Sequence, residues 1–362
     1  MSAKLCDQPG PGARRRVAGR QQRGTQPGMT AGHCRACGHH LLHRVLDLGL
    51  VSAADDFPPA DLPVDPAEVS HPLAMDLCSG CGLAQLAEDD TDTAEPRGVE
   101  PQALKDQAAE AVRRVAQAGW LRGTGGVVKE FGSPHGGSWL PLLAERGYRT
   151  TCGRADVVLD SFGIMHEADQ RRAFEDRAAA TAPDGVLLLQ FHTLGAIVAH
   201  GQWNSLRHGH FAYYSTPVIV SQLRRVGMRA AHAWTFGLYG GTVLVAAVHG
   251  TGDPGPTVCA LLESEAALTD PATVGVVQDA ADSQVVALRC WLEEERAEGR
   301  RIFAYGAASR AVALFGRAGV DRSLVCAVAD ASPAKQGRRM PGTDVPIISC
   351  LLYTSPSPRD RS

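Results

Sequence analysis

The sequence lacks several features that would place it in a well-defined class of protein. Its 362 residues hold no apolar run of about 18 residues, so it predicts no helix that crosses a membrane. The formal net charge is only -3, so no broad basic field exists and nucleic acid is not an expected partner. The chain opens at Met1 without the apolar segment of a secretory signal, which predicts a cytoplasmic protein.

A glycine turn within residues 127–148 is similar to a nucleotide-binding turn in outline but not in spacing. An apolar run, a turn with glycines and an amphipathic segment predict a strand, a turn and a helix. Open α/β sheets bind ligands at such a point, beyond the carboxyl end of a strand. The spacing Gly132-x3-Gly136-Gly137 is not that of a dinucleotide site, and the Lys-Ser/Thr ending of a phosphate loop is absent. The pattern is compatible both with a ligand-binding turn and with an ordinary connection between a strand and a helix.

Cysteines are well represented, and four of the ten form two C-x2-C pairs. These are Cys34 with Cys37 and Cys78 with Cys81, and a glycine follows each pair. Two residues between thiolates let both sulfurs face one ion, so two pairs predict a closed tetrahedral site for a structural Zn²⁺. A redox pair is the alternative, but the thioredoxin-like setting is missing and doubled pairs favour a metal.

Composition divides the chain into five segments. Residues 1–28 are rich in Gly, Pro, Gln and Arg and predict a disordered tail. Residues 29–90 hold the cysteine pairs, and 101–250 and 257–349 each show alternating strand and helix patterns. Residues 350–362 form a polar Pro/Ser segment that looks like translated adapter sequence and is predicted to be non-native. The fold class is therefore predicted as α/β.

Several elements can be predicted from periodicity alone. Predicted strands cover residues 45–50, 83–86, 155–162, 186–191 and 242–248, and predicted helices cover 101–120, 167–180, 216–227 and 276–298. A Pro-rich loop is expected after residues 55–59, and a turn at 182–185. Residues 301–310 repeat the strand, glycine turn and helix pattern, and 324–330 predict a further strand that ends in Asp330.

Histidines and aromatic residues are concentrated in residues 203–215. A cleft beyond the carboxyl edge of the sheet would bring such side chains together. A packed, hydrogen-bonded loop without a catalytic role is the alternative interpretation.

The order of short motifs along residues 34–348 resembles that of the three-part sugar C-methyltransferases of deoxysugar biosynthesis. The motifs are the two cysteine pairs with Gly82-Leu83-Ala84-Gln85-Leu86, Glu130-Phe131-Gly132, Pro183-Asp184-Gly185-Val186, His208-Gly209-His210-Phe211-Ala212-Tyr213-Tyr214-Ser215, Tyr239-Gly240-Gly241-Thr242, Tyr305-Gly306-Ala307, and Lys335-Gln336-Gly337 with Pro341-Gly342-Thr343 and Pro346-Ile347. The resemblance implies a small zinc-binding domain, a central Rossmann-like class I methyltransferase sheet that binds S-adenosylmethionine, and a second Rossmann-like domain, truncated here. It implies methylation of a nucleotide-linked, dTDP-type, 4-keto deoxysugar through an enolate.

The same resemblance implies roles for particular residues. His210 matches the general base, and His208 and Tyr213 are expected beside it in the catalytic site. The residues expected to contact S-adenosylmethionine are Glu130, Gly132, Gly136, Gly137 and Asp160. Those expected to contact the nucleotide sugar are Tyr214, Tyr305 and Lys335.

The chain also departs from the family pattern. Residues 133–136 replace the polar centre of the glycine turn, and Tyr148 is followed by Ala155 after only six residues. The strand whose acidic residue holds the ribose, with the next strand and helix, is therefore expected to be deleted. Arg207 and Gly209 stand where the family has Tyr and Glu. A methyltransferase-like binding or accessory protein without activity is the alternative function.

Overall fold

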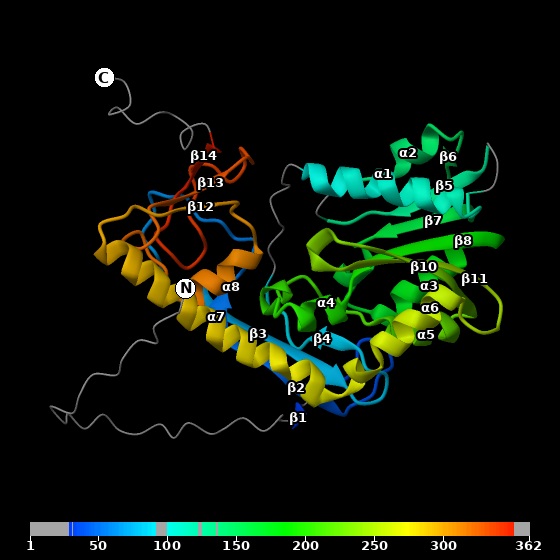
Figure 1. The fold of residues 1–362 in the computed structure, drawn as a ribbon, viewed down its shortest axis with the longest axis horizontal. Coiled ribbons are helices and arrows are strands. Elements are labelled where there is room, and N and C mark those ends of the chain that lie inside the picture. Colours follow the sequence, from blue (N-terminus) through cyan, green and yellow to red (C-terminus); the bar gives the residue numbers. More distant parts are fainter. Residues whose placement is uncertain (1–28, 31, 92–99, 122–124, 135–136, 351–362) are drawn as a thin grey trace.

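The computed structural model describes residues 29–30, 32–91, 100–121, 125–134 and 137–350. The predicted tail at 1–28, and all but Cys350 of the predicted tail at 350–362, lie outside the described residues. The described chain forms three β-sheets with helices packed on them (Figure 1). The α/β prediction is confirmed.

The first sheet is antiparallel and has the order β1-β2-β3-β4-β9. Its strands are β1 (Met29–Thr30), β2 (Leu42–Ser52), β3 (Val69–Cys78), β4 (Ala84–Leu86) and β9 (Ala212–Tyr213). The strand β3 was not predicted, although Leu73, Met75 and Leu77 alternate and are buried in one core. The Pro-rich stretch before it is interrupted only by the short 3-10 helix Pro66–Glu68.

The second sheet has the order β10-β11-β8-β7-β5-β6. Its strands are β5 (Val127–Phe131), β6 (Arg149–Thr150), β7 (Ala155–Ser161), β8 (Thr181–His192), β10 (Met228–Phe236) and β11 (Thr242–His249). The strands β5 to β8 run parallel, β11 runs antiparallel to β8, and β10 is antiparallel to β11 and so runs in the direction of β5 to β8. Such an arrangement is a Rossmann-like sheet, and β5 lies at the point where chain order reverses, between β6 and β7.

Helices cover both faces of this second sheet, as Figure 1 shows. Those packed on it are α1 (Gln102–Gln117), α2 (Leu140–Ala144), α3 (Gln170–Ala180), α5 (Thr216–Arg225) and α6 (Pro256–Ser264). Within β7, Val157 and Leu159 face the core of α1 and α2 while Val158 faces that of α3 and α5. Burial on both faces explains why these strands read as continuous apolar runs.

The turn predicted at residues 182–185 is wrong, because β8 already begins at Thr181. The pairing of β7 with β8 is irregular between Ala155 and Val157. At Gly185 an added Cβ would lie 2.8 Å from the carbonyl oxygen of Ala155. Gly185 therefore serves the close approach of two strands rather than a turn.

The third sheet is parallel and has the order β12-β13-β14, formed by β12 (Phe303–Tyr305), β13 (Ala327–Asp330) and β14 (Ile347–Ser349). The helices beside it are α7 (Pro271–Ala297) and α8 (Arg310–Arg317). Leu292 of α7 is buried with this sheet, while Val274 and Val277 of the same helix are buried with β2 and β3. The long helix thus joins two sheets, as is visible in Figure 1.

The three parts share structure across the predicted segment boundaries. The strand β9 comes from the central segment but pairs with β4 of the cysteine-bearing sheet. Phe57, from the segment of the cysteine pairs, is buried in the core of the third sheet. The loop before β9 is consequently held between the first and second sheets.

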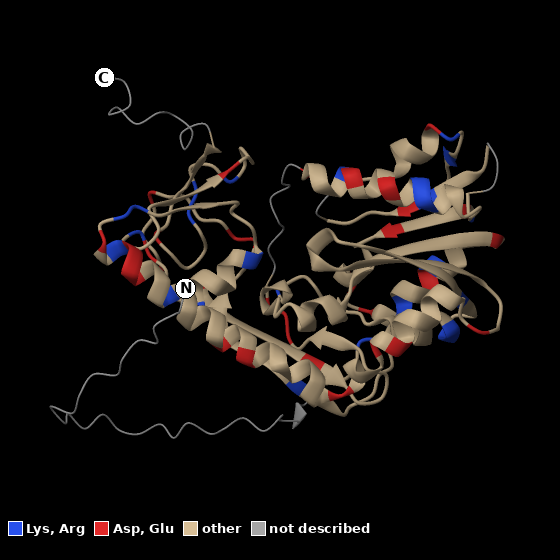
Figure 2. Ribbon diagram, viewed as in Figure 1, with Lys and Arg blue, Asp and Glu red and all other residues tan. Residues whose placement is uncertain are grey.

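Among the described residues, no helix has the length and apolar character needed to cross a membrane. Basic and acidic residues are interspersed along the described elements (Figure 2), in keeping with the small formal net charge of -3.

Candidate functional site

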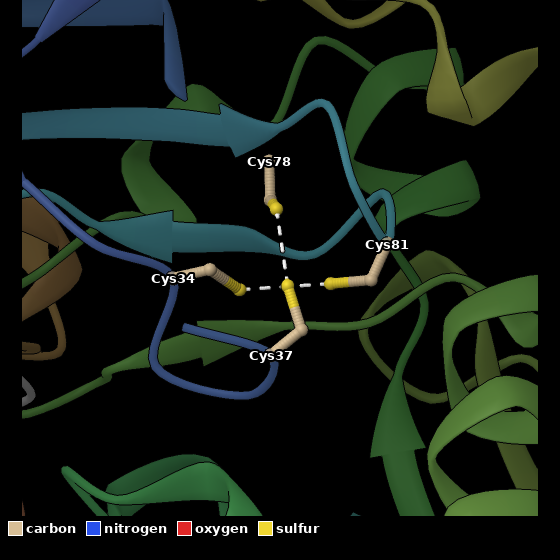
Figure 3. Close-up of side chains that lie close together, drawn as sticks. All are labelled: Cys34, Cys37, Cys78 and Cys81. Carbon is tan, nitrogen blue, oxygen red and sulfur yellow. Dashed lines mark hydrogen bonds between the residues drawn. The ribbon is translucent and has the colours of Figure 1, made fainter. Parts of the chain in front are cut away.

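The four predicted cysteines meet at one point (Figure 3). Cys34 and Cys37 lie in the loop before β2, Cys78 ends β3, and Cys81 lies in the turn to β4. All four Sγ atoms lie within 4.8 Å of one another, and the pairs Cys34–Cys81 and Cys37–Cys78 are each 3.6 Å apart. Zn–S bonds of about 2.3 Å place tetrahedral sulfurs about 3.8 Å apart, so the donor set fits zinc.

The backbone around the cysteines also suits a closed metal site. Gly38 and Gly82, which follow the two pairs, have φ of 72° and 76°, a left-handed conformation that favours glycine. The Gly80 amide donates to Cys78 Sγ at 3.3 Å. Four sulfurs complete the coordination shell and leave no position for a substrate, so this zinc would be structural.

A cavity of about 450 Å³ lies at the carboxyl ends of β5 and β7. Its walls come from the central sheet, from the loop at residues 205–213 and from the turn after β12. Open α/β sheets bind ligands at the carboxyl ends of strands flanking a reversal of strand order, which is where this cavity lies.

The glycine turn after β5 forms one wall of the cavity. Glu130 accepts hydrogen bonds from Ser138 Oγ at 2.5 Å and from the Trp139 amide at 2.8 Å, which ties the turn to the strand end. Glu130, Gly132 and Gly137 all line the cavity. A Cβ at Gly132 would meet nothing within 4 Å, while one at Gly137 would lie 2.6 Å from Glu100 Oε1. Gly136 lies outside the described residues.

Asp160 was expected to contact the cofactor, but it does not lie at the cavity. It is fully buried, does not line the cavity, and its carboxylate accepts from the amides of Gly163 and Ile164 at 2.8 and 3.0 Å. Arg177 Nε donates to its other oxygen at 2.8 Å. Burial raises the pKa of Asp160, while the Arg177 charge acts in the opposite direction. Its role is to shape the turn after β7.

His210 and Tyr213, which were expected in the catalytic site, line the cavity, and Arg207 lines it with them. Arg207 Nε donates to His210 Nε2 at 2.9 Å, and the Arg207 guanidinium lies 3.6 Å from Asp55 Oδ1. Tyr213 Oη accepts from the Arg207 amide at 3.1 Å and donates to the Ser205 carbonyl at 3.3 Å. Burial raises the pKa of Tyr213, so its hydroxyl stays protonated. The ring of His166 packs edge-on against that of His210.

His208 and Tyr214 do not line the cavity. His208 Nε2 donates to the Pro72 carbonyl at 3.1 Å, and burial lowers the pKa of its imidazole. The Tyr214 hydroxyl bonds to Gln170 Oε1, and its ring is packed between Phe174 and Phe191. Neighbours in an extended segment point to opposite sides, so Tyr213 faces the cavity while Tyr214 faces the core.

On the opposite side, the cavity is lined by Tyr305 and Lys335, the residues expected to contact the nucleotide sugar. Tyr305 is 76% exposed, whereas Lys335 is buried and its Nζ donates to the Ala307 carbonyl at 2.9 Å. Lys335 Nζ also lies 4.7 Å from the centre of the Phe57 ring. Asp330, at the end of β13, accepts from the Ala307 amide at 2.7 Å and so orders the glycine turn after β12.

His192, Tyr239 and Arg310 are among the cavity residues to which the sequence assigned no role. His192 ends β8, Tyr239 precedes β11, and Arg310 begins α8. Burial, and next the Arg310 charge, lower the pKa of His192 to about 4. Its place at the end of the most apolar strand was the available signal, since ligand-binding residues follow such strands.

Two cavity residues have unusual backbone conformations. Phe162 and Tyr239 have φ of 59° and 55°, and among the described residues they are the only non-glycine residues with positive φ. Their rings pack edge-on with centres 5.9 Å apart, and the Arg310 guanidinium lies 4.8 Å from the Tyr239 ring centre. Strained conformations of this kind concentrate at ligand sites.

The sheet edge beside the glycine turn is short. After the glycine turn and α2, where the second strand was expected to be deleted, the short strand β6 comprises Arg149–Thr150, both exposed. Thr151 and Cys152 follow it, so this strand supplies no carboxylate. The predicted loss of most of this unit agrees with the structure, although a two-residue strand is retained.

Two family models match this chain. Residues 34–92 match a model described as "Putative zinc binding domain", and residues 237–358 match one described as "C-methyltransferase C-terminal domain". The C-methyltransferase NovU of Streptomyces niveus is 24% identical over 204 residues, which are 55% of this chain and 49% of that protein. The chain thus spans about half the length of that relative.

Solved methyltransferase structures show a weaker likeness. The magnesium protoporphyrin IX methyltransferase of Synechocystis PCC 6803, with S-adenosylhomocysteine bound, is 15% identical and covers 43% of this chain and 90% of its own, with a TM-score of 0.30. The mitomycin 7-O-methyltransferase is 17% identical and covers 41% of this chain and 56% of its own, with a TM-score of 0.32. The assignment of a Rossmann-like fold is therefore based on the strand order of this chain and not on these solved structures.

Proposed function

We propose that this chain, which is similar to the sugar C-methyltransferases in its cysteine-bearing and C-terminal parts, is an S-adenosylmethionine-dependent C-methyltransferase. Its substrate in this proposal is a nucleotide-linked, dTDP-type, 4-keto deoxysugar. The observation that carries the proposal is the cavity, because it brings the turn after β5 together with the loop at 205–213 and the turn after β12. Each of these stretches carries a motif of the resemblance.

The donor half of the proposed site is the wall formed by the glycine turn. Bound S-adenosylmethionine would supply an electrophilic methyl group on a sulfonium. An added Cβ at Gly132 would meet no atom within 4 Å, so the turn leaves room for a ligand at the end of β5. The Glu130 carboxylate holds the turn in place and lines the same wall.

The acceptor half is rich in cationic donors. Arg207, Arg310 and Lys335 line the cavity, and Arg207 and Lys335 are buried. Methylation beside a ketone needs a base for the α-proton and a positive group for the enolate oxygen. In this proposal the Arg207 guanidinium stabilises the negative charge on the enolate oxygen. The Asp55 carboxylate and His210 hold the guanidinium in position. The Lys335 side of the cavity would receive the diphosphate and nucleotide.

The proposed zinc has no part in the chemistry. Its four cysteines fix the turn from β3 to β4, and β4 pairs with β9 directly after the loop that holds Arg207 and His210. The metal would therefore act on the cavity through this strand pairing. Loss of zinc would loosen the loop rather than remove a reacting group.

One observation favours a second candidate, a binding or accessory protein without methyl transfer. The strand β6 is two residues long and supplies no carboxylate for a ribose. The donor pocket of this chain would then have to hold the ribose by other contacts, or not at all.

Calorimetry with S-adenosylmethionine and S-adenosylhomocysteine separates the two candidates. An enzyme is expected to bind both, and then to transfer labelled methyl to a dTDP-linked 4-keto-6-deoxy sugar. Absence of binding at millimolar ligand would reject the enzyme and leave the binding protein. Retention of dTDP-sugar binding in that case would support the second candidate directly.

A further inference from the structure

A glutamine of α1 lines the cavity with one of its two polar atoms unused. Gln107 has 7% of its surface exposed, and Leu104, which lies one turn before it on the same face of α1, also lines the cavity. Gln107 Oε1 accepts a hydrogen bond from Gln190 Nε2 at 2.7 Å. Gln107 Nε2 is buried and has no hydrogen-bond partner within the described part of the chain. A buried donor without a partner costs free energy, and a ligand in the cavity can supply the acceptor.

The orientation of the Gln107 amide is set by two residues of the central sheet. Gln190 lies in β8 and is buried, and its Oε1 accepts from Ser161 Oγ of β7 at 3.5 Å, the long limit of a hydrogen bond. With its oxygen used in this way, Gln190 turns its nitrogen towards Gln107 Oε1. Since an amide carries one oxygen and one nitrogen on the same carbon, the nitrogen of Gln107 is the atom left for a ligand. These contacts make Gln107 a hydrogen-bond donor at the cavity.

The wall beside Gln107 carries two carboxylates. Glu100 precedes α1, and an added Cβ at Gly137 would lie 2.6 Å from its Oε1, so the start of α1 lies against the glycine turn. Glu130 belongs to the same turn, because its carboxylate accepts from the Trp139 amide. The cationic residues that line the cavity come from other elements and are Arg207, Arg310 and Lys335. A diphosphate fits those other walls, whereas the wall at Gln107 suits a ligand end with a positive charge beside its acceptor oxygens.

The methionyl end of S-adenosylmethionine has this pair of charges. Its ammonium group can be received by carboxylates such as those of Glu100 and Glu130, which line the cavity. Its carboxylate group needs N–H donors, and a hydrogen bond from a neutral amide to a charged carboxylate is stronger than one between two neutral groups. Gln107 supplies such a donor without adding a cation next to the sulfonium.

We infer that the Gln107 amide nitrogen binds the carboxylate of the methionyl group of S-adenosylmethionine, with Gln190 as the residue that positions the amide. This inference rests on the proposed function and deepens it by naming the contact that holds the amino-acid end of the cofactor. The strand β6 supplies no carboxylate for the ribose. The amino-acid end is therefore expected to contribute a large share of the cofactor affinity.

Calorimetry with two ligands tests the inference on the whole chain. The probes are S-adenosylhomocysteine and its analogue in which a hydrogen atom replaces the carboxyl group. The wild type is expected to bind S-adenosylhomocysteine at least about tenfold more tightly than the analogue. Gln107→Leu should weaken the binding of S-adenosylhomocysteine by about 10- to 100-fold and leave the affinity for the analogue unchanged. Gln117→Leu, at the exposed end of the same helix and outside the cavity, is the matched control and should bind both ligands as the wild type does.

Two further variants cover a Gln107→Leu protein that fails to fold and test the role of Gln190. Gln107→Glu keeps the shape of the side chain and an acceptor for Gln190, but it presents a carboxylate to the ligand. It should lose the preference for S-adenosylhomocysteine while still binding the analogue, which carries only the ammonium group. Gln190→Leu should weaken the binding of S-adenosylhomocysteine in the wild-type background and have no further effect in the Gln107→Leu background. An equal loss in both backgrounds would contradict a role for Gln190 through Gln107.

The outcomes separate the inference from the proposed function. A wild-type protein that binds both ligands equally would overturn the inference and leave the proposed function standing, whereas one that binds neither would overturn both. Wild-type affinity for S-adenosylhomocysteine in Gln107→Leu would mean that a water molecule pairs the amide, and the inference would be wrong. It would also be wrong if Gln107→Leu lost affinity for dTDP instead, or if Gln107→Glu kept the preference for the carboxylate ligand.

Discussion

The four-cysteine site and the cavity are both formed by short turns, but they differ in which parts of the chain supply their functional side chains. The two C-x2-C pairs supply all four sulfurs of the first site, and the structure brings these sulfurs within 4.8 Å of one another. The cavity takes its side chains from loops that are far apart in the sequence, including residues near 130, 192, 207 and 310. A self-contained site survives divergence as a recognisable motif, whereas an assembled site depends on every element around it.

The largest expected effect comes from breaking the self-contained site. Cys78→Ser should lose zinc, because three sulfurs no longer close the tetrahedron, and structural zinc contributes on the order of 10 kcal/mol in small zinc domains. Since β4 pairs with β9, we also expect the loop at 205–213 to loosen and ligand binding to be lost. Elemental analysis and thermal unfolding measure the change. Cys152→Ser, an exposed cysteine outside the cluster, is the control, and full zinc occupancy in Cys78→Ser would contradict the proposed ligand set.

A smaller effect is expected beneath the cavity, where one buried ion pair holds the turn after β7. Arg177→Met leaves the fully buried Asp160 without its cation and should cost about 3–5 kcal/mol of unfolding free energy. The double variant Arg177→Met with Asp160→Asn should recover part of this loss. Arg171→Met on the exposed side of α3 should change stability by less than about 1 kcal/mol. Equal effects of Arg171→Met and Arg177→Met in urea unfolding would contradict a supporting role for the pair.

The buried imidazole of His192 should make the free energy of unfolding depend on pH in the acidic range. The pKa of His192 is lowered from 6.5 to about 4 in the folded protein, so between these values the unfolded chain binds more protons. Folding stability therefore falls as pH decreases from about 6.5 towards 4. At pH 5 this residue alone should remove about 2 kcal/mol relative to pH 7, and His192→Gln should abolish that share. Urea unfolding at both pH values measures it; an identical pH dependence in wild type and His192→Gln would refute this environment for His192.

The smallest effect on stability is expected in the glycine turn. Gly132→Ala places a methyl group where nothing lies within 4 Å, so the free energy of unfolding should change by less than about 0.5 kcal/mol. If the turn faces S-adenosylmethionine, the same methyl group should weaken cofactor binding by about tenfold, or 1.4 kcal/mol. Calorimetry and urea unfolding give the two numbers. Unchanged affinity in Gly132→Ala would mean that the turn is an ordinary connection between strand and helix.

Most elements followed from local pattern. The runs that became β5, β7 and β8 are apolar because both of their faces are covered, and such runs are visible without knowledge of the fold. The strand β3 escaped prediction because prolines precede it and Pro72 interrupts its alternation, although Leu73, Met75 and Leu77 alternate into one core. The turn at 182–185 was predicted from Pro and Gly, but Gly185 is needed there for the close approach of Ala155.

The sequence by itself determined the zinc ligands and the apolar strands β5, β7, β8 and β11, because ligand spacing and apolar periodicity are local properties of the chain. Only the tertiary structure decided which side chains share the cavity. Pairing of β9 with β4 turned Tyr213 inward and left His208 and Tyr214 outside, and burial of Asp160 beneath the sheet gave it Arg177 as a partner. The physical reason is that facing and burial depend on contacts between distant segments, which neither composition nor spacing records.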